Sequence, residues 1–189
     1  MGYRISSLSR LPSISGINWY VFILGEHRWK DDFIEKVNEN FNELAENIGP
    51  NAAIVSGHPN TNLCQELAHA LEMASWNEHT IINKLVISGQ DQPAVLVLNS
   101  HPREVTKNST VFYIPISEIY NSFQSVEIFF DKLCAALRND TVPQFLKVFK
   151  KNEILKSIAN NIDISIPLFG IVSFNLTNLV KDKLKNYKQ

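Results

Sequence analysis

Residues 92–98 read Gln-Pro-Ala-Val-Leu-Val-Leu, a proline followed at once by an unbroken apolar run. Proline has no backbone N–H to donate, so it is tolerated at the first residue of a strand but not in the middle of one. A short run of valine and leucine without polar alternation is typical of a strand that is covered on both faces. We therefore predict a central buried strand from Ala94 to Leu98, with Pro93 at its start.

Two further strands and a helix are expected ahead of this stretch. Residues 19–24 form an aromatic and aliphatic run without alternation, the pattern of another strand buried on both faces. Residues 33–48 carry apolar side chains every three or four positions, which is the period of an amphipathic helix, and Gly49-Pro50 ends it. Ala52–Val55 is then predicted to be a short buried strand.

A second helix is expected from Asn62 onward. Asn62 and Gln65 have the spacing of a capping pair, in which a side chain accepts a hydrogen bond from the backbone three residues later. The apolar residues that follow at helical spacing would form its inner face: Leu63, Leu67, Ala70, Leu71 and Ala74. Residues 76–87 fit a short helix as well as a strand, and we favour the helix.

The segment after the central strand predicts a second strand and a last helix. Residues 110–116 are rich in β-branched and aromatic side chains, and a loop of about ten residues joins them to the central strand, which favours an antiparallel pair. Pro115 favours an edge strand or a strand end. Ser125 can cap a helix that buries Phe129, Phe130, Leu133 and Leu137.

The predicted order is strand, helix, strand, helix, strand, strand, helix, with a proline leading into the third strand. This order resembles the thioredoxin fold over residues 18–140. The resemblance implies an α/β three-layer sandwich, in which a mixed sheet carries helices on both faces and Pro93, usually cis in that fold, lies beside the active-site turn. Residues 1–17 are expected to be a lead-in with little structure of its own, and residues 141–189 a basic, apolar and mainly helical extension.

The turn that matches the thioredoxin active site lacks its cysteines. Redox thioredoxins carry Cys-x-x-Cys there, because the helix N-terminus lowers the pKa of the attacking thiol. Residues 25–30 read Gly-Glu-His-Arg-Trp-Lys instead, so disulfide exchange at this turn is excluded. Trp and Arg are favoured anchors at interfaces, and in thioredoxin-like proteins a client backbone pairs beside this proline. The residues His27, Arg28, Trp29, Gln92 and Pro93 are therefore predicted to form a docking surface, unless Trp29 packs on its own helix.

A single cysteine supports an alternative function. Cys64 would lie in the first turn of the second helix, six residues after His58, where the helix N-terminus favours a thiolate and an imidazole can act as its base. This pattern suggests a thiol enzyme centred on Cys64. The other interpretation is that Cys64 is a small core residue, as Cys134 is expected to be, since free cysteine is among the most buried residue types.

No metal or cofactor is predicted. The five histidines do not have metal-ligand spacing, and no glycine-rich phosphate loop is found. The two distant cysteines give no disulfide framework, and the first 16 residues lack the apolar core of a secretory signal, which together favour a cytoplasmic protein.

Charge divides the chain into an acidic body and a basic tail. Residues 21–144 hold 8 basic and 16 acidic side chains, whereas residues 145–189 hold 8 basic and 3 acidic ones. In the tail, Phe169 lies in an apolar stretch too short to span a bilayer, and Lys181 and Lys185 lie on an amphipathic helix. Such a tail can fold back on the body, dock on a partner or lie on an anionic membrane. Few stacking aromatics accompany the lysines, which argues against nucleic acid.

Taken together, the sequence predicts a non-catalytic interaction or adaptor module that holds another protein through the Trp29 turn, the Pro93 turn or the tail residues Phe169, Lys181 and Lys185. The thiol enzyme and a membrane-surface module are the alternatives. The sequence carries no signal of the oligomeric state.

Overall fold

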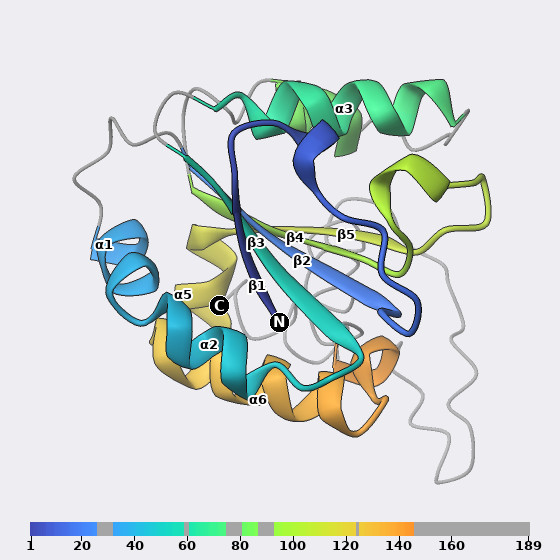
Figure 1. Ribbon diagram of the computed structural model, residues 1–189. Coiled ribbons are helices and arrows are strands. Elements are labelled where there is room, and N and C mark those ends of the chain that lie inside the picture. Colours follow the sequence, from blue (N-terminus) through green and yellow to red (C-terminus); the bar gives the residue numbers. More distant parts are fainter. Residues whose placement is uncertain (26–31, 59–60, 75–80, 87–92, 124, 146–189) are drawn as a thin grey trace, which may run out of the picture. The chain divides into compact units, whose positions relative to one another are not determined.

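The structure is a computed structural model that describes residues 1–25, 32–58, 61–74, 81–86, 93–123 and 125–145. All of these residues belong to one unit, Met1–Lys151. The predicted α/β class is confirmed, because a mixed five-stranded sheet carries helices on both of its faces (Figure 1).

The sheet is centred on β2 and has the strand order β1-β3-β2-β4-β5. β3 runs parallel to both β1 and β2, β4 runs antiparallel to β2, and β5 runs antiparallel to β4. Every residue of β2 and β4 is buried, as their unbroken apolar sequences predicted. The strands are β1 (Gly2–Ile5), β2 (Trp19–Leu24), β3 (Ala52–Gly57), β4 (Ala94–Leu98) and β5 (Val111–Pro115).

Two apolar cores lie on the two faces of the sheet. Alternate side chains of β2 serve both cores, with Val21 and Ile23 in one and Tyr20 and Phe22 in the other. The first core also contains Val142, which is fully buried. Four helices cover this first core: α1 (Asp32–Glu39), α2 (Phe41–Asn47), α5 (Ile116–Phe123) and α6 (Val126–Arg138). The second core lies under α3 (Leu63–Met73), the helical residues 81–86 and the 3-10 turn η1 (Leu8–Arg10).

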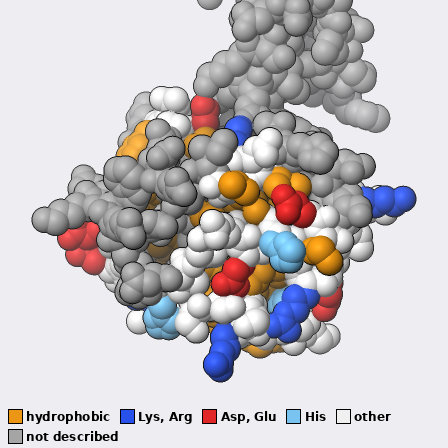
Figure 2. Space-filling model, turned by 90° about the horizontal axis from the view of Figure 1, so that it is seen from above, with side chains coloured by type: hydrophobic (Ala, Val, Ile, Leu, Met, Phe, Trp, Pro, Cys, Tyr) orange, Lys and Arg blue, Asp and Glu red, His pale blue; other side chains and the backbone are white. Residues whose placement is uncertain are grey.

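The outer surface of α3 is of mixed character. Gln65, His69 and Glu72 are exposed there, and Met73 is 74% exposed. Figure 2 shows charged and histidine side chains interspersed with apolar ones on this face. Such a surface is what a helix with one buried side and one solvated side is expected to present.

Both predicted helix caps are confirmed. The Asn62 Oδ1 atom accepts a hydrogen bond from the backbone N of Gln65 at 3.2 Å. The Ser125 Oγ atom accepts one from the backbone N of Ile128 at 3.1 Å. The helix that Ser125 caps buries the four apolar residues expected of it. Residues 81–86 are helical, and the rest of the ambiguous segment 76–87 lies outside the described residues.

The prediction that residues 1–17 have little structure is wrong. β1 pairs with β3 in the register Gly2 to Ile54, and the Met1 ammonium donates to the Ala52 carbonyl at 3.1 Å. η1 follows, and three apolar side chains of the segment are buried: Ile5, Leu8 and Leu11. The serines between them, and the proline that follows Leu11, concealed this order, because only about one residue in three faces the core.

Two helix predictions are corrected as well. The helix expected over residues 33–48 is divided into α1 and α2 at Asn40. The Lys36 carbonyl accepts from both the backbone N of Asn40, at 3.1 Å, and its side-chain Nδ2, at 2.9 Å, and a side-chain bond of this kind can bend a helix. α5 was not predicted at all. Its first residue, Ile116, was assigned to the preceding strand because the β-rich run of residues 110–116 continues into the helix without a polar break.

Leu11 provides a test of whether the N-terminal segment is part of the core. The Leu11 side chain is 2% exposed, so Leu11→Ala should lower the free energy of unfolding by about 2–4 kcal/mol through lost burial and a residual cavity. Urea denaturation followed by circular dichroism measures this change. Ser6→Ala, at an exposed position of the same segment, is the control and should leave the midpoint unchanged. Equal midpoints for both variants would show that the segment contributes nothing to the core.

Candidate functional site

One end of the sheet brings the start of β4 beside the end of β2. Leu24 pairs with Ala94, which places Gly25 next to Pro93. A Cβ atom added to Gly25 would lie 3.6 Å from the Pro93 Cβ and 2.6 Å from the Ile34 Cδ1. A side chain at residue 25 would therefore require the Ile34 side chain of α1 to shift, and the turn after β2 begins beside the proline.

Pro93 itself is buried. Its carbonyl accepts a hydrogen bond from the Ile116 backbone N at 3.0 Å, which connects the start of β4 to the start of α5. Pro93 is the one predicted binding residue that the structure describes. The Gln92–Pro93 bond lies outside the described residues, and so do the other predicted binding residues: His27, Arg28, Trp29, Gln92, Phe169, Lys181 and Lys185.

Ser56 is a buried polar residue near the same end of the sheet. It lies in β3, registered with Ile23 of β2, and is 6% exposed. Its Oγ atom has no hydrogen-bond partner among the described residues. A buried hydroxyl without a partner costs about 1–3 kcal/mol, so its presence here is a departure from an otherwise apolar sheet.

The two cysteines are both buried. Cys64 is 7% exposed and belongs to the core under α3, whereas His58 is exposed. Cys134 lies in the opposite core, and burial raises the pKa of its thiol to about 11, which confirms the core position expected of it. Within the described residues, no three His, Cys, Asp or Glu side chains are grouped to hold a metal ion.

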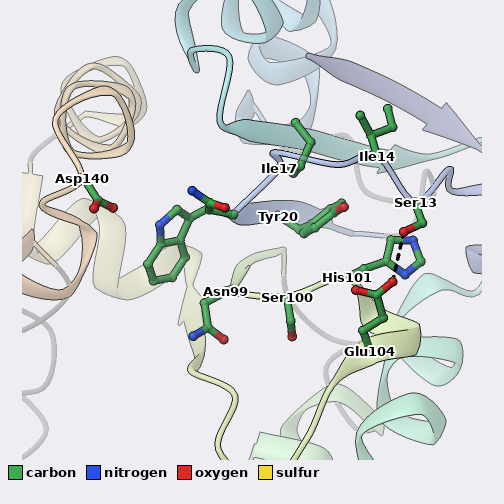
Figure 3. Close-up of a pocket in the computed structure, with 11 residues that line it drawn as sticks. Ser13, Ile14, Ile17, Tyr20, Asn99, Ser100, His101, Glu104 and Asp140 are labelled. Atoms are coloured by element: carbon green, nitrogen blue, oxygen red, sulfur yellow. Dashed lines mark hydrogen bonds between the residues drawn. The ribbon is translucent and has the colours of Figure 1, made fainter.

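A cavity of about 460 Å³ lies at the other end of β2 and β4 (Figure 3). We call it the strand-end cavity. It is lined by side chains that precede and begin β2, by the segment that follows β4, by Glu104 of the 3-10 turn η2 (Pro102–Glu104), and by Asp140, which follows α6. Because β4 is antiparallel to β2, the end of one strand meets the start of the other here.

His101 is a deeply buried residue of this cavity, at 3% exposed. Its Nδ1 atom accepts a hydrogen bond from the Arg103 backbone N at 3.2 Å, so the neutral ring carries its proton on Nε2. The Nε2 atom is closed to solvent and makes no hydrogen bond of good geometry with the described residues, although the Leu11 carbonyl lies close enough to favour its proton. The ring packs edge-on against Tyr20, with 5.4 Å between centroids. Burial lowers the pKa of His101, and the Leu11 carbonyl and Glu104 oppose this effect only in part.

Asp140 has an unusual backbone for an aspartate, with a φ of 54°. It follows the last residues of α6, where the Thr141 backbone N donates to the Ala136 carbonyl at 2.8 Å. This bond is the one that closes a helix C-terminus through a left-handed residue, a position that glycine usually occupies. The Thr141 Oγ1 atom donates to the same carbonyl at 3.5 Å, and Asp140, which is exposed, is one of the residues that line the cavity.

The sequence analysis did not identify the strand-end cavity. Its signal was present in the polar residues at strand ends, Asn18 before the first buried run and Asn99 to His101 after the third. In the sequence alone, such residues cannot be told from ordinary turn formers. They lie together only because β2 and β4 are adjacent and antiparallel.

Comparisons of the chain with family models, with curated proteins and with solved structures found no match. What the fold defines is an α/β protein with a mixed five-stranded sheet. None of the described helices is both long and apolar enough to cross a membrane.

The buried imidazole predicts a pH dependence of stability. An unperturbed histidine has a pKa of about 6.5 in the unfolded chain, and burial lowers the pKa of His101 in the folded protein. The unfolded state therefore binds the proton first, so the free energy of unfolding should fall as the pH drops from 7 through 6.5 towards 5. Urea titrations at several pH values measure this loss. His101→Gln should flatten the dependence and His69→Gln, at an exposed position, should not; a wild-type profile that stays flat over this window would contradict the burial argument.

The burial of both thiols predicts slow alkylation. Cys64 and Cys134 should react with iodoacetamide at pH 8 only at the rate at which the protein unfolds, because the reagent cannot reach a buried thiol and the Cys134 thiolate is scarce below a pKa of about 11. Mass spectrometry counts the modified cysteines, and protein in urea is the control that should acquire two labels. Rapid labelling of Cys64 in the folded protein would instead support the thiol enzyme.

Proposed function

We propose that this chain is a non-catalytic protein-interaction module on a redox-inactive thioredoxin-like fold. The observation that carries the proposal is the position of Pro93, at the start of β4, beside Gly25, at the start of the turn after β2. In the thioredoxin fold the corresponding proline lies beside the active-site turn. The order of β2, α1, β3, α3, β4, β5 and α6 supports the same resemblance, and α5 is an addition to it.

The chemistry of this end of the sheet favours binding over catalysis. The turn at residues 25–30 contains no cysteine, and both cysteines of the chain are buried in the cores. What the turn does contain is Arg28 and Trp29, two residue types that dominate binding energy at protein interfaces.

The backbone at the proline supports an extended partner segment. Pro93 has no N–H, and its carbonyl is already bonded to Ile116, so it offers no further strand pairing of its own. The pairing groups in our proposal are therefore those of Gln92, with Arg28 and Trp29 supplying side-chain contacts. Backbone pairing of this kind gives affinity, and the side chains give selectivity. The tail residues Phe169, Lys181 and Lys185 form a second contact in this proposal.

Site-specific cross-linking in cells tests the proposal. A benzophenone amino acid placed at position 29 of the full chain should give one protein adduct of defined mass, because Trp29 is proposed to face the partner. The same residue at position 128 is the control, since Ile128 is 43% exposed on α6. Gln92→Pro, which removes the backbone N–H proposed to pair, should reduce the adduct at position 29.

Several outcomes would contradict the proposal. Adducts of equal yield from positions 29 and 128 would indicate random collision, and no adduct from position 29 would remove the docking surface. The membrane-surface alternative would be favoured by a different result. In that case the full-length protein floats with phosphatidylserine vesicles, and a variant with both Lys181→Glu and Lys185→Glu does not.

A further inference from the structure

We propose that His101 is the centre of an acid-sensitive latch, which holds residues 9–14 against the 3-10 turn η2 and releases them locally when the imidazole becomes charged. The ring lies among three elements: η2, β2 and the N-terminal segment. The proposal does not depend on the docking surface, because His101 follows β4 and Pro93 precedes it.

The turn η2 is attached to the N-terminal segment by its own side chains. The Arg103 Nη2 atom donates to the Ser9 carbonyl, and the Ser13 Oγ atom donates to Glu104 at 3.0 Å (Figure 3). Between these two bonds, the Leu11 carbonyl lies close to the His101 ring. Residues 9–13 are therefore held to one short turn at three successive points.

His101 closes the turn that carries these side chains. It precedes η2, and its Nδ1 atom accepts from the Arg103 backbone N while its carbonyl accepts from the Glu104 backbone N at 2.8 Å. The ring is buried and packs edge-on against Tyr20, so it does not reach water in the closed arrangement. The positions of Arg103 and Glu104 opposite the segment therefore depend on the lone pair of Nδ1.

A second proton on the ring removes that lone pair. The neutral ring carries its proton on Nε2, so the added proton goes to Nδ1, where it faces the Arg103 N–H. Two donors then point at one another and a positive charge is buried, and both effects disfavour the closed arrangement. Opening of η2 exposes the ring to water and removes the bonds of Arg103 and Glu104 to the segment. One protonation thus acts on the whole of residues 9–13.

The charged groups around the ring do not cancel this effect. Burial is the largest influence on His101 and lowers its pKa. On η2, Glu104 favours the charged ring and Arg103 opposes it. On β2, burial raises the pKa of Tyr20 from its usual value of about 10, so this side chain stays neutral in acid.

The opening is expected to end at η1. Glu66 of α3 accepts from the Ser7 Oγ atom at 2.9 Å and from the Leu8 backbone N, and neither bond involves His101. β1 is paired with β3 ahead of this point. Leu11 is buried, and its burial opposes release, so the open form is a minority at neutral pH. Acid increases that minority and leaves the strands paired.

Hydrogen exchange of the full chain, followed by NMR at pH 7, 6 and 5, tests the inference. The Leu11 and Glu104 amides, which are bonded within the latch, report its opening. After correction for the intrinsic rate, their opening constants should rise at least about tenfold from pH 7 to pH 5, because the open form binds the proton that the closed form excludes. Low concentrations of urea should leave these constants unchanged, whereas those of β2 and β4 amides should increase, since local opening exposes little surface.

The variant His101→Asn identifies the group responsible. Asparagine can accept from the Arg103 N–H at this capping position and does not titrate, so the rise should disappear while the turn is retained. His69→Asn, at an exposed position of α3, is the matched control and should keep the rise. A rise that persists in His101→Asn, or latch amides that share the opening constants and urea dependence of β2 and β4, would overturn the inference.

A second measurement needs no variant. The ring protons of His101 in the native chain should titrate with a pKa below about 6.5, the value of an unperturbed histidine. A pKa at or above that value would overturn the inference, because acid would then stabilise the closed latch. Neither experiment bears on the docking surface at Pro93, which cross-linking tests separately.

Discussion

The rest of the structure depends on the position of β2 between β3 and β4. Each of its six side chains is buried, and alternate residues supply the cores on the two faces of the sheet. A strand without a solvent-facing side has no polar alternation to fix its register, so its neighbours fix it instead. β3 does so from one side by parallel pairing, and β4 does so from the other by antiparallel pairing.

This register gives the two ends of the sheet different chemistry. Leu24 opposite Ala94 brings Gly25 to Pro93, and Tyr20 opposite Leu98 brings the start of β2 to His101. These two pairs are four residues apart along β2, about 14 Å at 3.4 Å per residue. The first end offers an apolar glycine–proline contact, and the second offers carboxylates, amides and a buried imidazole. The two ends of β2 therefore differ in chemistry although they lie on one element.

The parts of the fold that the sequence predicted are those with a strong local pattern. Two kinds of element were predicted correctly: the strands at residues 19–24 and 94–98, and the helix caps at Asn62 and Ser125. Both burial on two faces and capping are determined within a few residues of sequence. β1 was missed because its partner is some fifty residues away and only Ile5 of its four residues is buried. α5 was missed for a different reason, since its first residue, Ile116, continues a β-rich run. The helical spacing of Ile116, Ile119 and Phe123 becomes evident only once the strand is known to end at Pro115.

The strand-end cavity was beyond local prediction for a physical reason. Its polar side chains come from segments as far apart as Ser13 and Asp140, and each has an ordinary explanation where it stands: Asn99 as a turn former and Asp140 as a residue that follows a helix. Their chemistry changes once the sheet brings them together. The Asn99 Oδ1 atom is used by the Thr110 backbone N, and the Nδ1 atom of His101 is used by the Arg103 backbone N. Which lone pairs and protons such a place still offers depends on those that the fold has already used, and these are known only after the register of β2 against β4 is fixed.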